Sequence, residues 1–388
     1  MAGGTRSYEM ARRLVAMGHE VHVITTWREP TKGTAWFEEQ IDGINVHWLP
    51  VRYNNAMGFG ARLWAFLRFA WRAARRAVTV GGDLVFATST PLTIAIPGVL
   101  AARRLRVPMV FEVRDLWPDI PIALGVLKNP LVKYTARCLE RFAYSNSKRI
   151  VALSDGMAAG IVATGYPQGH VTVIPNSCDL QLFQYDAIGA MRFRQSYPEL
   201  GLGPIVLYPG AIGMVNGVSY LAYLARGVLH ERPDVRFVVF GSGAEESQLL
   251  SVATDLEVLG VNFFLYPPLP KRELVDAFSA AAVVISLVID KPVLYANSAN
   301  KFFDALASGT AVAINYEGWQ AKLLEQEGAG IALGSSPQDA VVPMLELLSS
   351  PERIRDCGKR ARMLAESRFD RDKLALRLER VFLEAIEK

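Results

Sequence analysis

Cysteine is scarce in this sequence. Its 388 residues include only Cys138, Cys178 and Cys357, and no two of them have the spacing of a metal-binding or disulfide-forming pair. This scarcity excludes a disulfide framework and fits a reducing compartment. The five histidines form no ligand motif such as two histidines on one helix turn. We therefore expect neither a metal ion nor another bound cofactor.

A strong charge of one sign and a long apolar run are also missing. The net charge of +4 does not by itself indicate nucleic-acid binding, and we expect none. The first twenty residues lack the apolar segment of a signal peptide. The uncharged stretch 84–102 contains Pro91 and Pro97, so it predicts a strand, a loop and a helix instead of a membrane span.

Short apolar strands alternate with helices along the whole sequence, and 388 residues exceed the size of one hydrophobic core. Strands are expected at 21–25, 45–49, 84–87, 109–113, 149–153, 171–176, 205–208, 236–240, 262–265, 283–286 and 311–315. This alternation predicts an α/β protein with two Rossmann-like, doubly wound domains. Ligands of such domains bind at the carboxyl ends of the strands, here in a cleft between the two.

The beginning of the sequence departs from this alternation. A helix that ends near Met17 leads directly into the first expected strand, although a strand should precede such a helix in a parallel sheet. We therefore expect the first strand of the N-terminal domain to be missing from this sequence.

Two glycine-rich turns follow strands of the second half. Gly210, Gly213 and Gly217, with Asn216, lie in the turn before a helix, and Gly241 and Gly243 lie in the turn after the next strand. Glycines let the backbone approach a ligand, and a helix N-terminus favours phosphate. Each turn alone could be an ordinary tight connection, but two in one domain favour a nucleotide site.

The most informative segment is 297–309. Asn300 and Lys301 stand at a predicted helix start, with Asn297 just before them, where amides and a cation can converge on a diphosphate. Asp304, one turn further, could accept hydrogen bonds from sugar hydroxyls. The alternative is that Lys301 caps its own helix and pairs with Asp304.

In the first half, charged residues surround the end of the strand 109–113. Asp115 and Asp119 could act as a base toward an acceptor hydroxyl, and Arg114 could hold a phosphate or orient a carboxylate. The alternative is an ordinary surface ion pair between Arg114 and Asp115.

Residues 60–77 predict an amphipathic helix. Its expected core face contains Leu63, Phe66, Leu67, Ala70 and Ala74, and its opposite face contains Arg62, Trp64, Arg68, Phe69, Arg72, Arg75 and Arg76. Arginines interleaved with aromatic residues, without an acid, are typical of a helix on an anionic membrane surface. A solvated face on a core-packed helix is the alternative.

Together these segments resemble the family-4 retaining glycosyltransferases of the GT-B fold over essentially the whole chain. The resemblance rests, in this order, on segments 3–6, 112–118, 154–157, 173–179, 208–217 and 295–309. Among these enzymes, the chain is most similar to bacterial transferases that add amino sugars such as N-acetyl-fucosamine during O-antigen and capsule assembly.

The resemblance implies domains at 1–177 plus 369–388 and at 178–368. The first would bind an acceptor, with Gly3, Gly4 and Arg6 contributing, and the second a nucleotide sugar, UDP-linked in our expectation. Transfer would proceed with retention, at the cytoplasmic face of the cell membrane, onto a lipid-linked glycan. A nucleotide-sugar 2-epimerase of the same fold and a degenerate binding protein are the alternatives.

Three positions depart from the family pattern. Met214 and Asn216 replace basic residues common in the first donor-domain loop, which leaves Lys301 as the leading diphosphate cation. Ala296 replaces the first of two glutamates that contact the donor in many members, and Asp304 stands in the second position.

Overall fold

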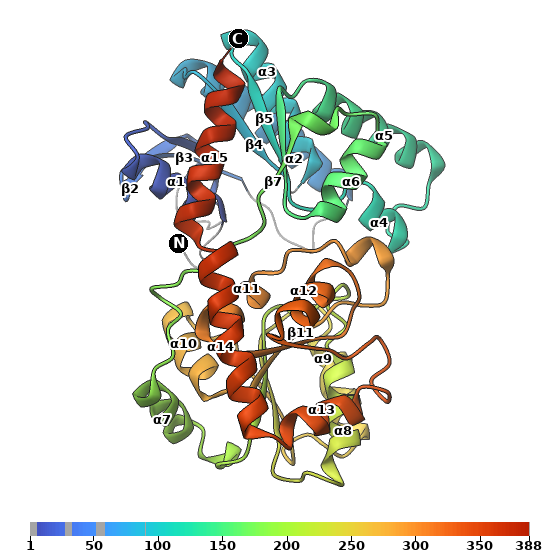
Figure 1. Cartoon of the computed structure of the whole chain (residues 1–388). Coiled ribbons are helices and arrows are strands. Elements are labelled where there is room, and N and C mark those ends of the chain that lie inside the picture. Colours follow the sequence, from blue (N-terminus) through green and yellow to red (C-terminus); the bar gives the residue numbers. More distant parts are fainter. Residues whose placement is uncertain (1–5, 28–32, 52–58, 90, 388) are drawn as a thin grey trace. The chain divides into compact units, whose positions relative to one another are not determined.

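The computed structural model describes residues 6–27, 33–51, 59–89 and 91–387; for residues 59–63 and 65 it describes the backbone alone. These residues form two compact α/β units (Figure 1). Residues 6–175 together with 372–387 make up the N-terminal unit, and residues 176–371 make up the C-terminal unit.

The C-terminal unit is built on one parallel sheet of six strands in the order β10-β9-β8-β11-β12-β13. The strands are β8 (Ile205–Pro209), β9 (Arg236–Phe240), β10 (Phe263–Tyr266), β11 (Val283–Ser286), β12 (Ala311–Ile314) and β13 (Gly330–Ala332). The chain builds outward from β8 to β10 and then returns to place β11 beside β8. In sheets with such a reversal, ligands bind at the carboxyl ends of the strands where it occurs, which are here β8 and β11.

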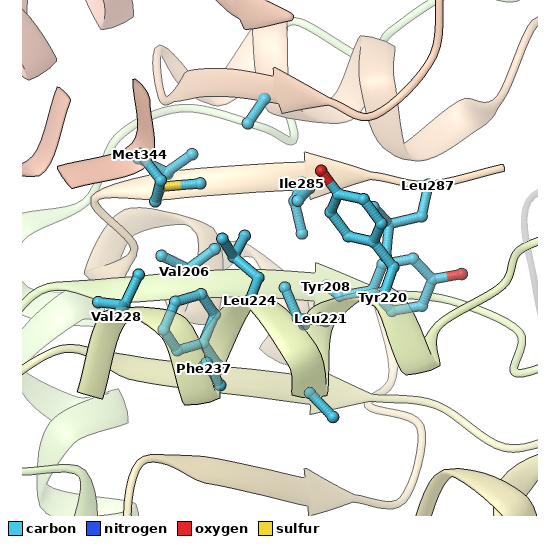
Figure 2. Close-up of a cluster of buried hydrophobic side chains, with 14 of the residues drawn as sticks. Val206, Tyr208, Tyr220, Leu221, Leu224, Val228, Phe237, Ile285, Leu287 and Met344 are labelled. Carbon is cyan, nitrogen blue, oxygen red and sulfur yellow. The ribbon is translucent and has the colours of Figure 1, made fainter. Parts of the chain in front are cut away.

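Helices cover both faces of this sheet, which explains why its central strands are apolar throughout. They are α7 (Ala187–Ser196), α8 (Ser219–Leu229), α9 (Glu246–Asp255), α10 (Lys271–Ala280), α11 (Asn300–Ser308), α12 (Trp319–Glu327), α13 (Val341–Leu348) and α14 (Pro351–Arg368). Figure 2 shows Leu224 of α8 above Val206 and Phe237 of the sheet, and all three side chains are fully buried.

The described strands of the N-terminal unit form two separate sheets. One has the order β1-β3-β2, from β1 (His22–Trp27), β2 (Phe37–Ile41) and β3 (Ile44–Pro50). The other has the order β4-β5-β6-β7, from β4 (Val85–Thr88), β5 (Met109–Val113), β6 (Arg149–Ala152) and β7 (Val171–Val173). A single continuous sheet, as the strand alternation suggests, is therefore not formed by the described residues.

The strand β2 is absent from the sequence-based expectation. It pairs antiparallel with β3 through a two-residue turn, in which Asp42 and Gly43 have φ angles of 49° and 79°. Two successive residues with positive φ define the tight hairpin turn that Asp-Gly favours. The dipeptide was therefore an available signal for this hairpin.

The N-terminal unit contains α1 (Arg6–Ala16), α2 (Phe59–Val80), α3 (Ala95–Leu105), α4 (Asp119–Ala123), α5 (Pro130–Ser145), α6 (Asp155–Ala163) and most of α15 (Arg371–Ile386). The last helix buries Leu374 and Leu378 in one cluster with Met10 of α1 and Val110 of β5. In the part of the chain that the structure describes, no helix combines the length and the apolar character needed to cross a bilayer.

Truncation of Leu224 to alanine should destabilise the C-terminal unit by about 2–5 kcal/mol, because a buried leucine leaves a cavity in a close-packed core. Urea unfolding followed by circular dichroism measures this loss. Leu202 is 93% exposed, so Leu202→Ala is the matched control and should leave the unfolding curve unchanged. Equal unfolding curves for both variants would contradict the core packing described here.

Candidate functional site

A tyrosine and a lysine meet at the carboxyl end of β8, one of the two strands at which the strand order reverses. Tyr208 is fully buried, and its hydroxyl donates a hydrogen bond of 2.9 Å to the carbonyl of Ala211 in the following turn. Burial raises the pKa of Tyr208, so the hydroxyl keeps its proton. The Tyr208 side chain thereby fixes the start of the glycine-rich turn.

Lys301 is the second residue of α11, which begins at Asn300, at the helix start expected from the sequence. Its Nζ donates a hydrogen bond of 2.7 Å to the Tyr208 hydroxyl and lies 3.9 Å from the centre of the ring. A cation at this distance from an aromatic face is attracted by it. The amine end of the side chain is enclosed, and burial lowers the pKa of Lys301 to about 7.

Gly210 makes room for this lysine. Its φ is +150°, and a Cβ atom at this position would lie 3.1 Å from both Cε and Nζ of Lys301. A side chain at 210 would therefore press on the amine or displace it. The glycine of the first turn and the lysine of α11 belong to one local arrangement.

No carboxylate of the described residues lies within ion-pair distance of Lys301. The alternative that Lys301 pairs with Asp304 is therefore not what the structure shows. Asp304 instead lies close enough to Cys178 that its charge, after burial, contributes to raising the pKa of that thiol to about 12. A buried ammonium without a carboxylate is costly, and an anionic ligand would relieve that cost.

The two glycine-rich turns pack directly on each other. A Cβ atom at Gly241 would lie 2.0 Å from the carbonyl oxygen of Gly210, and one at Gly243 would lie 2.1 Å from that of Ile212. The amide of Gly210 donates to the carbonyl of Phe240 at 2.9 Å. Gly241 and Gly243 are thus required by backbone packing, and their predicted contact with a nucleotide stays a prediction.

The rest of the first turn closes on the segment that follows β11. Gly217 has a φ of +56°, and a Cβ atom there would lie 2.8 Å from Cγ2 of Ile289. The amide of Asn216 donates to the carbonyl of Gly213 at 2.8 Å. A Cβ atom at Gly213 would meet nothing within 4 Å, so Gly213 is the glycine of this turn with open space beside it.

Asn297 and Asn300 occupy different positions before α11. The Asn297 side chain donates to the carbonyl of Leu294 at 2.9 Å and accepts the amide of Ala299 at 3.3 Å, which fixes the shape of the loop. Asn300 is exposed at the first position of the helix. Of the two amides, only Asn300 is presented at the surface.

The sequence did not single out Tyr208, Asn176 or Ser298 as individual site residues. The buried Asn176 donates through Nδ2 to the carbonyl of Ser298 at 2.5 Å, and its amide donates to the Ser298 hydroxyl at 3.0 Å. These bonds hold the loop that leads into α11. A tyrosine at the end of a strand and an asparagine after a buried strand are weak signals, because both residue types are common at such positions.

In the N-terminal unit, Arg6 is buried in a network with Glu112. Its Nε lies 2.7 Å from Oε1 of Glu112, and its terminal nitrogens donate to the carbonyls of Pro175 and Ile174 at 2.6 and 2.9 Å. Thr88 donates to the other Glu112 oxygen at 2.7 Å. Arg6 thus ties α1 to β5 and to the end of β7, and its predicted acceptor contact stays a prediction.

The remaining acceptor residues lie after β5. The Arg114 amide donates to the Ser89 hydroxyl at 3.1 Å, and the residue is half-buried, as is Asp115. Asp119, the first residue of α4, forms an ion pair with Arg137 of α5. Gly3 and Gly4 lie outside the described residues.

The structure corrects the predicted faces of α2. Leu67, expected in the core, is 45% exposed, and Trp64, Arg68, Trp71 and Arg75 are exposed as well. Phe69, Arg72 and Arg76 are half-buried, and the side chain of Arg62 lies outside those described. Ala70 and Ala74 are buried as predicted, and Ala73 joins them on the core face, because small residues allow α2 to lie close to its neighbours.

Two family models together match most of this chain. "Glycosyl transferase 4-like domain" matches residues 2–177, and "Glycosyl transferases group 1" matches residues 192–364. The chain belongs to the glycosyltransferases. The matches confirm the resemblance to glycosyltransferases, whereas the narrower likeness to amino-sugar transferases stays a prediction.

A curated relative is a putative colanic acid biosynthesis glycosyl transferase of Escherichia coli strain K12, WcaI. It is 24% identical over 287 residues, which span 67% of each chain. Sucrose-phosphate synthase of Thermosynechococcus elongatus superposes with a TM-score of 0.77 at 17% identity, covering 97% of this chain and 92% of that one.

The Anabaena protein HepE, solved in complex with UDP-glucose, superposes with a TM-score of 0.69 at 14% identity. The match covers 94% of this chain and all of that one. These likenesses confirm the predicted GT-B fold.

Replacing Arg6 by alanine should lower the free energy of unfolding by about 3–5 kcal/mol, because Glu112 would be left as a buried unpaired charge. Arg12 on the same helix pairs with Glu9 at a partly exposed position, so Arg12→Ala should cost less than about 1 kcal/mol. Thermal and urea unfolding of the two variants measure the difference. If Arg6→Ala leaves the free energy of unfolding unchanged, the network with Glu112 does not stabilise the fold. Acceptor binding would then be the remaining role of Arg6.

Proposed function

We propose that this chain transfers a sugar, with retention, from a nucleotide-diphosphate donor to a lipid-linked glycan in cell-surface polysaccharide synthesis. The colanic acid relative supports the pathway class, and the UDP-glucose complex of HepE supports a UDP-linked donor. An amino-deoxy sugar is the donor we expect from the resemblance. The enzyme would act without a metal or other cofactor, at the cytoplasmic face of an anionic membrane.

The observation that carries this proposal is the enclosed amine of Lys301 beside Gly210. It lies at the positive end of α11, where the helix dipole also favours an anion. A diphosphate placed there would supply the missing negative charge. Its oxygens would also accept hydrogen bonds from the N–H groups of Lys301 that do not donate to Tyr208. A nucleoside diphosphate is the ligand that fits a cation, a helix start and glycine turns at one strand end.

The reaction breaks the bond between the sugar C1 and the β-phosphate oxygen and forms a bond from C1 to the acceptor oxygen. Negative charge grows on the leaving diphosphate, so Lys301 and the amides before α11 would stabilise the transition state more than the bound donor. The acceptor hydroxyl would attack from the leaving group's side and pass its proton to the departing phosphate. Retention of configuration follows from attack on that side.

The other predicted residues have supporting positions in this mechanism. In the C-terminal unit, Asp304 and Asn300 would contact the sugar and the phosphates from the first turns of α11. In the N-terminal unit, Arg114 and Asp115 would orient the acceptor.

A binding panel tests the donor class. UDP-, GDP-, ADP- and dTDP-sugars, with a CMP-sugar as the monophosphate control, would be titrated by calorimetry. We expect one diphosphate sugar to bind and the monophosphate to fail. The bound donor would then be incubated alone and with a lipid-linked acceptor. Transfer with the donor's anomeric configuration supports the proposal, whereas an epimer formed without acceptor would establish the epimerase.

Replacing Lys301 by alanine should lower kcat/KM by about ten- to a hundredfold, because a charge-assisted contact to the leaving group is worth about 1.5–3 kcal/mol. The control is Lys359→Ala, which removes an exposed ammonium of α14 and should leave the rate unchanged. Initial rates of transfer under matched conditions decide the comparison. A Lys301→Ala enzyme within about threefold of the parent would remove Lys301 from the mechanism.

Donor binding should also take up a proton above neutral pH. The pKa of about 7 leaves the unliganded Lys301 mostly neutral at pH 8, and a bound diphosphate favours the ammonium form. Because the complex binds more protons than the unliganded protein, affinity should fall as the pH rises from 7 to 9. Calorimetry in two buffers of different ionisation enthalpy measures the uptake, which Lys301→Ala should abolish.

A further inference from the structure

One face of α2 is more apolar and more basic than an ordinary solvated surface. Its exposed residues recur at the spacing of one helix face and are Trp64, Leu67, Arg68, Trp71 and Arg75, here called the outward face. The two tryptophans are 69% and 59% exposed. Large aromatic side chains exposed in one row mark an interaction surface rather than scattered surface residues.

Other side chains of α2 make its described contacts with the rest of the unit. The helix is held by its buried alanines and by arginines on its flank, since Arg72 donates to the carbonyl of Thr34 at 3.0 Å and Arg76 hydrogen-bonds to His47 at 3.0 Å. Both guanidinium groups also lie over the Trp36 ring, at 5.8 and 5.9 Å. Of the five arginines predicted to face the membrane, Arg72 and Arg76 therefore make contacts within the unit instead.

The helix of the outward face and its neighbour α3 carry basic residues and no acids, and the nearby carboxylate of Glu38 is already paired with Arg76. The sequence of α2 contains no Asp or Glu, and Arg75 lies 4.9 Å from the Trp71 ring, so aromatic and cationic groups are adjacent. The neighbouring helix α3 packs along α2, also lacks acids, and exposes Arg103 and Arg104. An anionic partner is the electrostatic complement of this surface.

We propose that the outward face is the docking surface for a lipid bilayer that contains anionic phospholipids. The helix would lie parallel to the membrane plane, with Trp64 and Trp71 at the level of the headgroups, Leu67 between them, and Arg68 and Arg75 on lipid phosphates. The inference rests on the proposed function, because a lipid-linked acceptor brings the enzyme to the membrane. The outward face differs from the membrane face predicted from the sequence, because it is centred on Trp64 and Trp71 and leaves out Arg72 and Arg76.

Vesicle flotation of the full chain tests the proposal. Vesicles of phosphatidylcholine alone and with 30% phosphatidylglycerol would be compared at low and high salt for the parent chain and two variants. Trp64→Ser with Trp71→Ser should lower binding to anionic vesicles about tenfold or more. Arg68→Gln with Arg75→Gln should lower it about thirtyfold at low salt and remove its dependence on phosphatidylglycerol.

The matched control is Arg272→Gln with Arg355→Gln, which removes two exposed arginines of the C-terminal unit and should bind vesicles as the parent does. Calorimetric titration with the nucleotide sugar accompanies each variant, and both outward-face variants should keep the parent's donor affinity. If the parent chain floats with anionic vesicles but binds no nucleotide sugar, the proposed function is wrong and the membrane assignment stands.

Three outcomes overturn the membrane assignment. In the first, the parent chain floats with neither vesicle, and in the second, the two outward-face variants bind like the control. In the third, light scattering finds a dimer that the tryptophan variant dissociates, which would make the outward face a contact between two copies of the chain.

Discussion

The candidate site depends on the enclosure of one ammonium group without a carboxylate partner in the described residues. Lys301 stays in place because three weak terms act together: the Tyr208 hydroxyl, the Tyr208 ring and the room left by Gly210. None of them neutralises the charge, so burial dominates and shifts the proton equilibrium of the amine toward neutral pH. Under the proposed function, a bound diphosphate would return the proton and neutralise the charge.

The same geometry explains why the glycines serve two purposes. Gly241 packs on the backbone of Gly210, and Gly210 in turn borders the lysine, so a side chain at either position would disturb the neighbouring turn before it met any ligand. Glycine-rich turns in such a sheet are thus first a condition for bringing two loops together. Under the proposed function, their approach to phosphate would be a consequence of that packing.

Much of this could be predicted from the sequence, because the strands are short and apolar and the helix at Asn300 has a clear start. The Arg6 network could not, since its partners lie 106 to 169 residues away and only the folded chain brings them together. Ala70 and Ala74 of α2 are buried as predicted, but the exposure of Leu67 was not foreseen, because helical periodicity alone does not show where the core face ends. The hairpin at Asp42 was missed although its turn sequence was available.

The residues that hold α2 in place and the residues that it exposes are different, and this has a consequence for how its sequence can change. Its fold-bearing contacts are made by small residues and by Arg72 and Arg76, whereas Trp64 and Trp71 contribute little to holding the helix. Substitutions in the exposed row therefore escape purifying selection for stability. The sequence of this surface can therefore change while the architecture beneath it is retained.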